Sequence, residues 1–271
     1  MKKFAFSAAS AFAFPSTAQS ELKFWKTRPW LFSFCFLSNS RFLRQRILCV
    51  ESIRRLLDRH AELGYAASGE DRLVASFFPK PGFYVDVGCN HPSSYSNTFM
   101  LYKRGWHGIN IDANANLIAL HQRVKPRDQS IFAAIAQCRK TLTYTQFEGG
   151  TLMASLDPAF VRANLAQGRR IQSESALETK TLTEVLEQCQ APARFELLNV
   201  NVEGLDLEVL QSLDFARFRP QMIVVEILGY DLEKFQADPI FELLASKGYR
   251  LAGYTHMNAI FRERNVTGGA H

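Results

Sequence analysis

The sequence lacks the features that define several large classes of protein. Its five cysteines lie far apart and none belongs to a CxxC pair, which excludes a disulfide framework and a cysteine-based zinc site. No apolar run approaches the roughly 20 residues that a membrane-spanning helix requires, so we expect no stable membrane insertion, and we expect no metal site. What the chain does have is 47% hydrophobic residues among 271. That content is enough for a large core and excludes extensive disorder.

Positive charge is scarce outside the amino-terminal segment. Residues 1–50 hold eight Lys and Arg and one acidic residue, whereas residues 51–271 hold 24 basic and 25 acidic side chains. A nucleic-acid-binding domain concentrates positive charge on the folded surface that meets phosphate. Because the remainder of the chain is close to neutral, we predict that nucleic acid is not a partner.

The amino-terminal segment fits three interpretations. Two lysines precede an apolar run over residues 4–14, and a proline and small residues follow, as in a secretory signal. The basic, acid-poor composition of residues 1–50 also fits an organellar transit peptide. The third interpretation is a disordered or loosely docked extension. We assign residues 1–47 to an amino-terminal extension in all three.

From residue 48 on, predicted strands alternate with predicted helices. The strands are nearly continuous apolar runs, typical of a parallel sheet with helices on both faces. The last two strands have no helix between them, so they predict an antiparallel hairpin at the edge. We therefore predict a doubly wound α/β domain over residues 48–265, with residues 140–180 as an insertion or mobile cover and residues 266–271 as a tail. The predicted strands are 83–87, 108–112, 130–135, 195–202, 221–228, 249–254 and 259–262, and the predicted helices include 48–63, 94–104 and 205–213.

The chemistry of such a fold is expected outside the carboxyl ends of its strands. Gly88 ends the first strand and leaves room for a ligand near the backbone, but the GxGxxG pattern that binds a pyrophosphate is missing. A nucleoside without phosphate therefore fits better than a dinucleotide such as NAD. Asp112 ends the second strand, where an acidic residue typically binds ribose hydroxyls; a helix cap before Asn114 is the alternative. Asp86 lies within the first strand and requires a buried partner.

A second group of polar residues follows the strand predicted over 195–202. Asn199, Asn201 and Glu203 alternate, so their side chains point to the same side. Glu226 stands in the same relation to the next strand. The structural alternatives to a catalytic role are a favourable charge at a helix start for Glu203 and an ordinary surface-loop position for His91.

The sequence resembles a known family in four stretches that occur in order. They are Val85–Asn90, Tyr95–Thr98, Gly105–Asp112 and Asn201–Leu210. They resemble the FkbM-type S-adenosylmethionine-dependent methyltransferases, and the resemblance covers residues 60–263. It implies the Rossmann-like fold of class I methyltransferases, S-adenosylmethionine as cofactor, and methyl transfer to a hydroxyl on a sugar, glycan or secondary metabolite.

The resemblance also implies a cofactor site. The loop that contains Asp86, Gly88 and Asn90 would hold the methionine end of the cofactor. Asp112 would hold the ribose, and Ala134–Ile135 would border the adenine. Because S-adenosylmethionine is made and kept inside cells, we expect an intracellular, cytoplasmic protein, with the two targeting interpretations of the amino terminus as alternatives.

Two positions depart from the family pattern. Cys89 replaces the usual alanine, which is a small change. Asn201 replaces the usual aspartate, and asparagine keeps the shape and an acceptor but cannot take a proton. For catalysis we predict Glu203 or His91 as the base and Asn201 as the residue that orients the acceptor. The alternative is a degenerate S-adenosylmethionine-binding protein that has lost the chemistry.

Overall fold

The structure, a computed structural model, describes residues 64–227 and 235–264. The predicted amino-terminal extension, the helix predicted over 48–63 and the predicted tail lie outside the described residues. The chain divides into one unit of residues 1–62 and a second of residues 63–271, and only the second contains described residues. No helix in that described part is long and apolar enough to cross a membrane.

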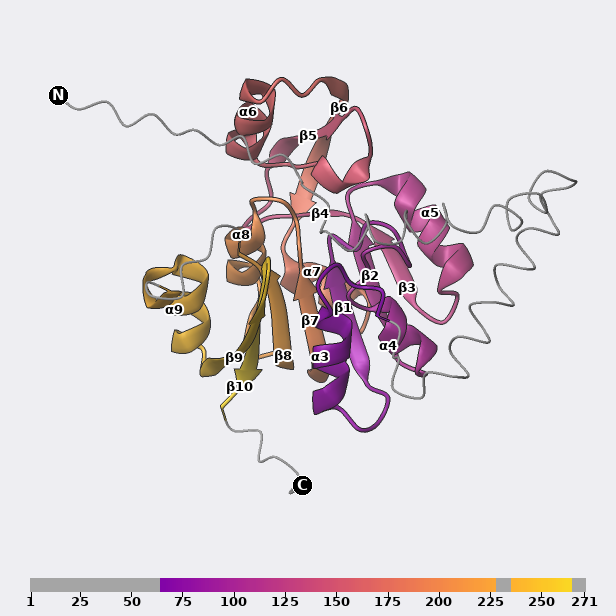
Figure 1. The fold of residues 1–271 in the computed structure, drawn as a ribbon, viewed down its shortest axis with the longest axis vertical. Coiled ribbons are helices and arrows are strands. Elements are labelled where there is room, and N and C mark those ends of the chain that lie inside the picture. The colour runs from indigo at the N-terminus through magenta and orange to yellow at the C-terminus, as the bar shows by residue number, and fades with distance from the viewer. Residues whose placement is uncertain (1–63, 228–234, 265–271) are drawn as a thin grey trace, which may run out of the picture. The chain divides into compact units, whose positions relative to one another are not determined.

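The described residues form a seven-stranded sheet (Figure 1) in the order β3-β2-β1-β7-β8-β10-β9. Neighbouring strands from β3 to β8 pair in parallel, and β10 is antiparallel to both of its neighbours. The predicted doubly wound, mostly parallel sheet with an antiparallel hairpin at one edge is thus confirmed. The strands are β1 (Phe83–Val87), β2 (His107–Asp112), β3 (Gln129–Phe132), β7 (Arg194–Val200), β8 (Arg219–Glu226), β9 (Tyr249–Thr255) and β10 (Asn258–Glu263).

Helices cover both faces of this sheet and bury its alternating side chains. Successive strand residues point to opposite faces, so Val85 and Val87 join one apolar cluster and Tyr84 joins the other. The first cluster includes the inner faces of α7, α8 and α9, and the second includes those of α3 and α4; α5 lies along β2 and β3. The helices are α3 (Glu70–Phe77), α4 (Phe99–Lys103), α5 (Ala115–Val124), α7 (Leu182–Gln188), α8 (Asp206–Gln211) and α9 (Pro239–Ser246).

Some elements differ from their predicted limits. α4 begins at Phe99 rather than at residue 94, because the residues before it form turns in which Tyr95 has a φ of 57°. The strand predicted over 130–135 is divided, since Ala134–Ile135 forms a separate strand, β4, that leaves the main sheet. The sequence pattern did not predict α3.

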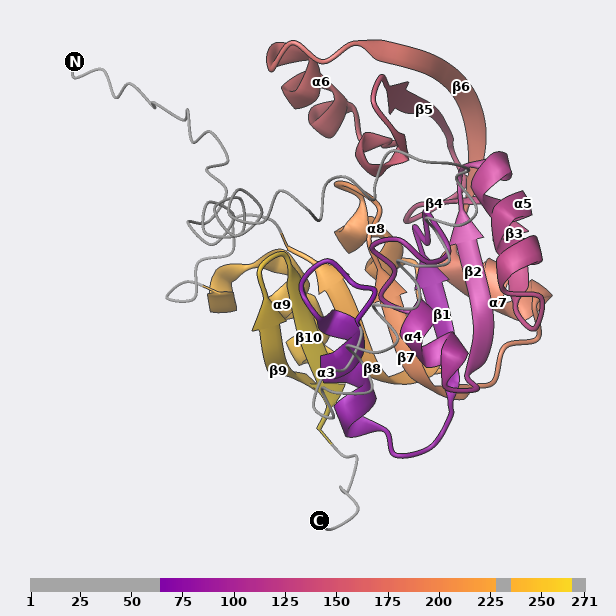
Figure 2. The ribbon, with the colours of Figure 1, turned by 45° about the vertical axis from the view of Figure 1, so that its right-hand side comes forward.

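The insertion forms a second sheet of three strands in the order β4-β6-β5 within the described residues. Its strand β5 is Thr141–Phe147, in which polar and apolar residues alternate as in a half-exposed strand. The residues after it, in which we predicted no regular element, form the 3-10 helix η2 (Thr151–Met153), α6 (Pro158–Ala166) and the ten-residue β6 (Ile171–Lys180). Most side chains of β6 are exposed, so its sequence carries no apolar period to reveal a strand. Figure 2 shows these elements beyond one end of the main sheet.

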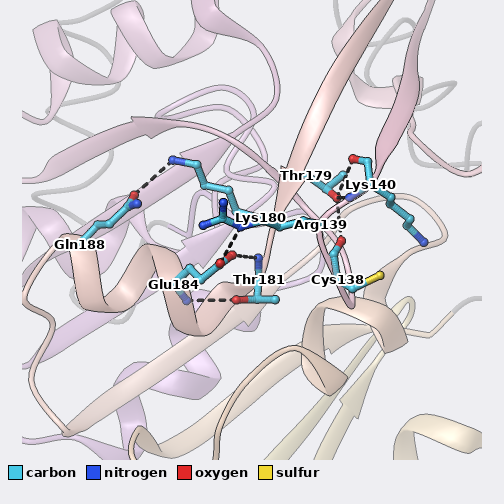
Figure 3. A network of polar contacts seen from close by, with 8 residues as sticks. All are labelled: Cys138, Arg139, Lys140, Thr179, Lys180, Thr181, Glu184 and Gln188. Carbon is cyan, nitrogen blue, oxygen red and sulfur yellow. Dashed lines mark hydrogen bonds and ion pairs between the residues drawn. The ribbon is translucent and has the colours of Figure 1, made fainter.

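Polar contacts join the two ends of the insertion at its base (Figure 3). The hydroxyl of Thr179 accepts a hydrogen bond from the N–H of Lys140 at 2.9 Å. Arg139 forms an ion pair of 2.7 Å with Glu184 on α7. Glu184 also completes the capping box with Thr181 at the start of that helix. The base of the insertion is therefore fixed to the main sheet's helical layer.

Candidate active site

A cavity of about 480 Å³ lies at the carboxyl ends of β1, β2, β7 and β8. The start of β10, the insertion between β5 and α6, the residues 94–97 before α4, and Ala67 also contribute to its walls. This is the expected ligand position in a doubly wound sheet. Eight of the nine predicted site residues line the cavity: Asp86, Gly88, Asn90, Asp112, Ala134, Ile135, Asn201 and Glu203.

The turn after β1 requires a glycine because two chain segments meet there. Gly88 has a φ of 74°, and a Cβ at this position would lie 1.7 Å from the carbonyl oxygen of Asn201. The N–H groups of Gly88 and Cys89 both donate to the carbonyl of Ile111, at 2.9 and 3.2 Å. The missing side chain therefore serves the close packing of β1, β2 and β7, a reason that the sequence interpretation, which invoked ligand access, did not include.

Asp112 is held in place by two backbone donors. Its Oδ2 accepts from the N–H of Asn90 and its Oδ1 from the N–H of Asn114, both at 2.8 Å. Burial raises the pKa of Asp112 to about 6, although both hydrogen bonds oppose the shift. Asn114 itself caps α5, since its side chain accepts from the N–H groups of Asn116 and Leu117. Asp112 is therefore not the helix cap, and its remaining lone pairs are available to a ligand.

Asn90 connects the β1 loop to the insertion. Its carbonyl is 2.9 Å from Nε2 of His121, and its Oδ1 accepts from the hydroxyl of Thr151 on η2 at 2.8 Å. Its backbone is strained, with a φ of 42°. Tyr95 and Glu203 also line the cavity with positive φ values, and strained residues tend to gather at functional sites.

Asp86 borders the cavity, but its carboxylate is bound inside the protein. It accepts from the hydroxyl of Thr98 at 2.6 Å and from the side-chain amide of Asn199 at 2.8 Å. The fully buried Lys125 donates to the same Thr98 hydroxyl at 2.8 Å. Burial lowers the pKa of Lys125, and the charge of Asp86 counteracts this shift. The network supplies the partner that Asp86 requires and supports the β1 loop.

The Ala134–Ile135 segment forms an apolar part of the wall. Both residues are buried, and Ala134 belongs to a small cluster with Tyr144 and Leu156 of the insertion. The flat face of an aromatic base fits such a surface, because contact through the face of the ring buries few polar groups. The arrangement is compatible with the predicted contact to an adenine.

Glu203 and Glu226 place two carboxylates on the cavity, at the ends of β7 and β8. Burial and the nearby Asp206 raise the pKa of Glu203 to about 7. Burial and the charges of Glu203 and Asp206 raise the pKa of Glu226 to about 8. Asp206 differs from both because it accepts from the N–H groups of Val202 and Gly204 and so fixes the turn. Near neutral pH the Glu203–Glu226 pair is therefore neither fully ionised nor fully protonated.

The other two predicted catalytic residues lie in different places. Asn201 lines the cavity, and its N–H donates to the carbonyl of Val87 at 3.0 Å. His91 does not line the cavity. Its Nδ1 accepts from the N–H groups of Ser93 and Ser94, at 3.2 and 3.0 Å. The structure thus brings Glu203 and Asn201 together but leaves His91 closing a turn nearby, which favours the structural alternative for this histidine.

Several contributors to the site were missed by sequence reasoning. Ser155 of the insertion donates from its hydroxyl to the carbonyl of Glu203 at 2.6 Å, and no sequence signal marks this loop serine. Asn258 lines the cavity beside Glu226, its partner in the β8–β10 register; its position at the start of the last strand was the available signal. In the part of the chain that the structure describes, no group of His, Cys, Asp or Glu side chains is placed to hold a metal ion.

One family model and several solved structures are similar to this chain. The model of the methyltransferase FkbM domain matches residues 86–251, and no curated protein matches the chain. Similar solved structures include a TehB-like S-adenosylmethionine-dependent methyltransferase from Corynebacterium glutamicum, with 13% identity, a TM-score of 0.40 and coverage of 81% of this chain and 98% of that chain. Methyltransferase FkbM from Methylobacillus flagellatus is 12% identical, with a TM-score of 0.42 and coverage of 67% of this chain and 43% of that one.

A third similar structure carries bound ligands. It is the 1,6-didemethyltoxoflavin-N1-methyltransferase of Burkholderia thailandensis with 1,6-didemethyltoxoflavin and S-adenosylhomocysteine, with 12% identity, a TM-score of 0.39 and coverage of 84% of this chain and 92% of that chain. Because the FkbM model matches more than half of the 271 residues, the chain belongs to the FkbM methyltransferase family, and its cofactor is S-adenosylmethionine.

Proposed function

We propose that this chain methylates a hydroxyl group on a sugar, glycan or secondary metabolite. The observation that carries the proposal is the pair of carboxylates, Glu203 and Glu226, on the part of the cavity formed by β7, β8 and β10. Methyl transfer to a hydroxyl requires a group that takes the hydroxyl proton. A carboxylate whose pKa burial raises to about 7, as in Glu203, is suited to this task, because a general base works best near the operating pH.

The ends of β1 and β2 suit S-adenosylmethionine. In our assignment the free lone pairs of Asp112 accept hydrogen bonds from the ribose, and Ala134–Ile135 contacts the adenine. The loop from Gly88 to Asn90 borders the methionine end. No Lys, Arg or His is among the described residues that line the cavity, so none of them repels the positively charged sulfonium. When bound, the cofactor supplies an electrophilic methyl group.

Glu203 acts as the base in this proposal, and Asn201 orients the acceptor hydroxyl. As the oxygen–methyl bond forms and the carbon–sulfur bond breaks, the hydroxyl proton passes to the carboxylate of Glu203. The hydrogen bond from Ser155 to the Glu203 carbonyl holds the strained turn that presents this carboxylate. Alignment of acceptor and donor supplies much of the acceleration. We assign acceptor selection to the insertion, which forms the wall opposite the strand ends.

Transfer of labelled methyl groups from S-adenosylmethionine to a panel of hydroxylated sugars and metabolites tests the proposal. We expect Glu203→Gln in the full chain to lower kcat by about 10²–10⁴-fold and to leave the affinity for S-adenosylhomocysteine unchanged. Glu178→Gln is the matched control, because Glu178 is exposed and lies outside the cavity. Cofactor binding without any O-methylated product, or full turnover by Glu203→Gln, would contradict the proposal.

Asn201 supports a second candidate function, that of a cofactor-binding protein without transferase activity. An amide cannot accept the hydroxyl proton, and Asn201 stands where the family usually has aspartate. If Glu203 is the base, Asn201→Asp changes kcat without creating an activity that the wild type lacks. Activity that appears only in Asn201→Asp would favour this second candidate.

A further inference from the structure

The cavity wall at β8 and β10 offers hydrogen-bond acceptors that the protein does not use. Glu226 is 7% exposed, and none of the described residues donates a hydrogen bond to its carboxylate. Asn258, its register partner on β10, is 3% exposed, and its Oδ1 is buried without a partner in the described structure. A buried acceptor without a donor is costly, and a nearly buried carboxylate without a cation is more so.

The orientation of the Asn258 amide is fixed from behind. Its Nδ2 donates to the carboxylate of Glu70 at 2.9 Å, and Thr255 donates to the same carboxylate oxygen. Glu70 is fully buried on α3 and accepts both hydrogen bonds. The amide cannot turn over without opposing its oxygen to the Glu70 oxygen, so Oδ1 remains directed away from α3. Oδ1 is therefore an unpaired acceptor beside Glu226, and the atom itself is buried in the wall behind the cavity surface.

No positive charge of the described cavity balances Glu226. Four of the described acidic residues line the cavity. Asp86 is bound by the network that contains Lys125, and Asp112 accepts hydrogen bonds from two backbone N–H groups. The side-chain carboxylates of Glu203 and Glu226 have neither a cation nor a hydrogen-bond donor among the described residues. The wall at β8 and β10 thus selects a ligand group that donates several hydrogen bonds and carries positive charge, which is the chemistry of a primary ammonium group.

We propose that the methyl acceptor is an amino alcohol whose protonated amine binds Glu226 while its hydroxyl faces Glu203. This inference rests on the proposed function, because it deepens the identity of the acceptor. The amine is an anchor and is not methylated, since it stays protonated and has no free electron pair. Binding of the ammonium favours the ionised form of Glu226, so it releases a proton from the protein wherever that carboxyl is protonated beforehand.

The minimal probe is 2-aminoethanol, compared with the neutral 1,2-ethanediol at matched ionic strength. Titration calorimetry of the full chain saturated with S-adenosylhomocysteine measures both affinities. We expect binding of 2-aminoethanol, weakened about tenfold or more by Glu226→Gln because a hydrogen-bonded charge contact is lost, and unchanged in the exposed control Glu178→Gln. Equal affinity of the two probes, no binding of 2-aminoethanol, or equal affinity in Glu226→Gln and wild type would overturn the inference.

The ammonium group of the cofactor is the other possible source of the same chemistry. If Glu226 held that group, Glu226→Gln would lower the affinity for S-adenosylhomocysteine, which has the amino acid end. The affinity for 5′-methylthioadenosine, which lacks that end, would stay unchanged. We expect no change in either affinity, and a selective loss for S-adenosylhomocysteine would overturn the acceptor assignment. Methylation of neutral sugars without binding of 2-aminoethanol would refute this inference alone. Selective binding of 2-aminoethanol without methyl transfer to any hydroxyl would refute the proposed function alone.

Discussion

Asp112 combines a structural and a ligand-binding role in one carboxylate. Each oxygen accepts one backbone N–H, and the remaining lone pairs serve the ribose in our assignment. We expect Asp112→Ala to lower the affinity for S-adenosylhomocysteine about ten- to a hundredfold, since a hydrogen bond to a charged group contributes about 1.5–3 kcal/mol. Asn114→Ala is the control, because it removes the α5 cap at a cost of about 1 kcal/mol and takes no acceptor from the cavity. Calorimetric titration that shows equal losses in both variants would contradict the assignment.

Alanine substitutions at Gly88 and Gly69 distinguish the cost of a steric clash from the cost of backbone strain. Both have a positive φ, but a Cβ at Gly88 meets the Asn201 carbonyl at 1.7 Å, whereas a Cβ at Gly69 meets nothing within 4 Å. We expect Gly69→Ala to lower the free energy of unfolding by about 1–2 kcal/mol. Gly88→Ala adds a displacement of the β1 loop or β7 and costs more, and it weakens cofactor binding as well. Denaturant unfolding measures the free energy of unfolding of both variants. Similar losses in the two would show that the β1 loop moves to accommodate the added Cβ at little cost.

At the scale of elements, the hydrogen bond between Thr151 on η2 and Asn90 couples the insertion to the cofactor half of the cavity. We expect Thr151→Val to weaken S-adenosylhomocysteine binding, because the strained Asn90 loses one of the contacts that hold it. Ser173→Ala is the control, since Ser173 makes an exposed hydrogen bond to Gln146 within the same insertion. Isothermal titration of the three proteins decides this point. An unchanged affinity in Thr151→Val would show that the insertion does not support the cofactor loop.

The elements that the sequence predicts and those that it does not differ in a physical respect. The buried strands β1, β2, β7 and β8 are apolar runs, and their ends locate Gly88, Asp112 and Glu203 at one edge of a sheet. In contrast, β6 is largely exposed and obtains its order from pairing with β5, to which local sequence contributes little. Lys125 follows α5 in sequence like an ordinary surface lysine, and only the folded chain places it against Thr98. Local pattern therefore predicts the frame of the site, while long-range contacts determine its support.

At the scale of the whole molecule, the carboxyl groups at the cavity make stability depend on pH. Burial raises the pKa of Glu203 from 4.5 to about 7 and that of Glu226 from 4.5 to about 8. The folded chain therefore holds protons that the unfolded chain has already lost in this range. Because the unfolded state binds fewer protons there, these groups lower the free energy of unfolding as the pH rises from about 4.5 to 8.

The effect of pH on stability can be tested by replacing Glu226, which has the higher pKa of the two carboxyl groups. Glutamine stays neutral at every pH, so we expect Glu226→Gln to raise the melting temperature relative to wild type at about pH 9 and to change it little at about pH 5. Each kcal/mol gained corresponds to about 2–4 °C for a domain of this size. The exposed Glu178→Gln, which removes the same formal charge, is expected to shift the melting temperature little at either pH. Calorimetric scans across the range measure the difference. If the melting temperatures of Glu226→Gln and wild type depend on pH in the same way, folding does not raise the pKa of Glu226, and its carboxyl group is hydrated in the cavity.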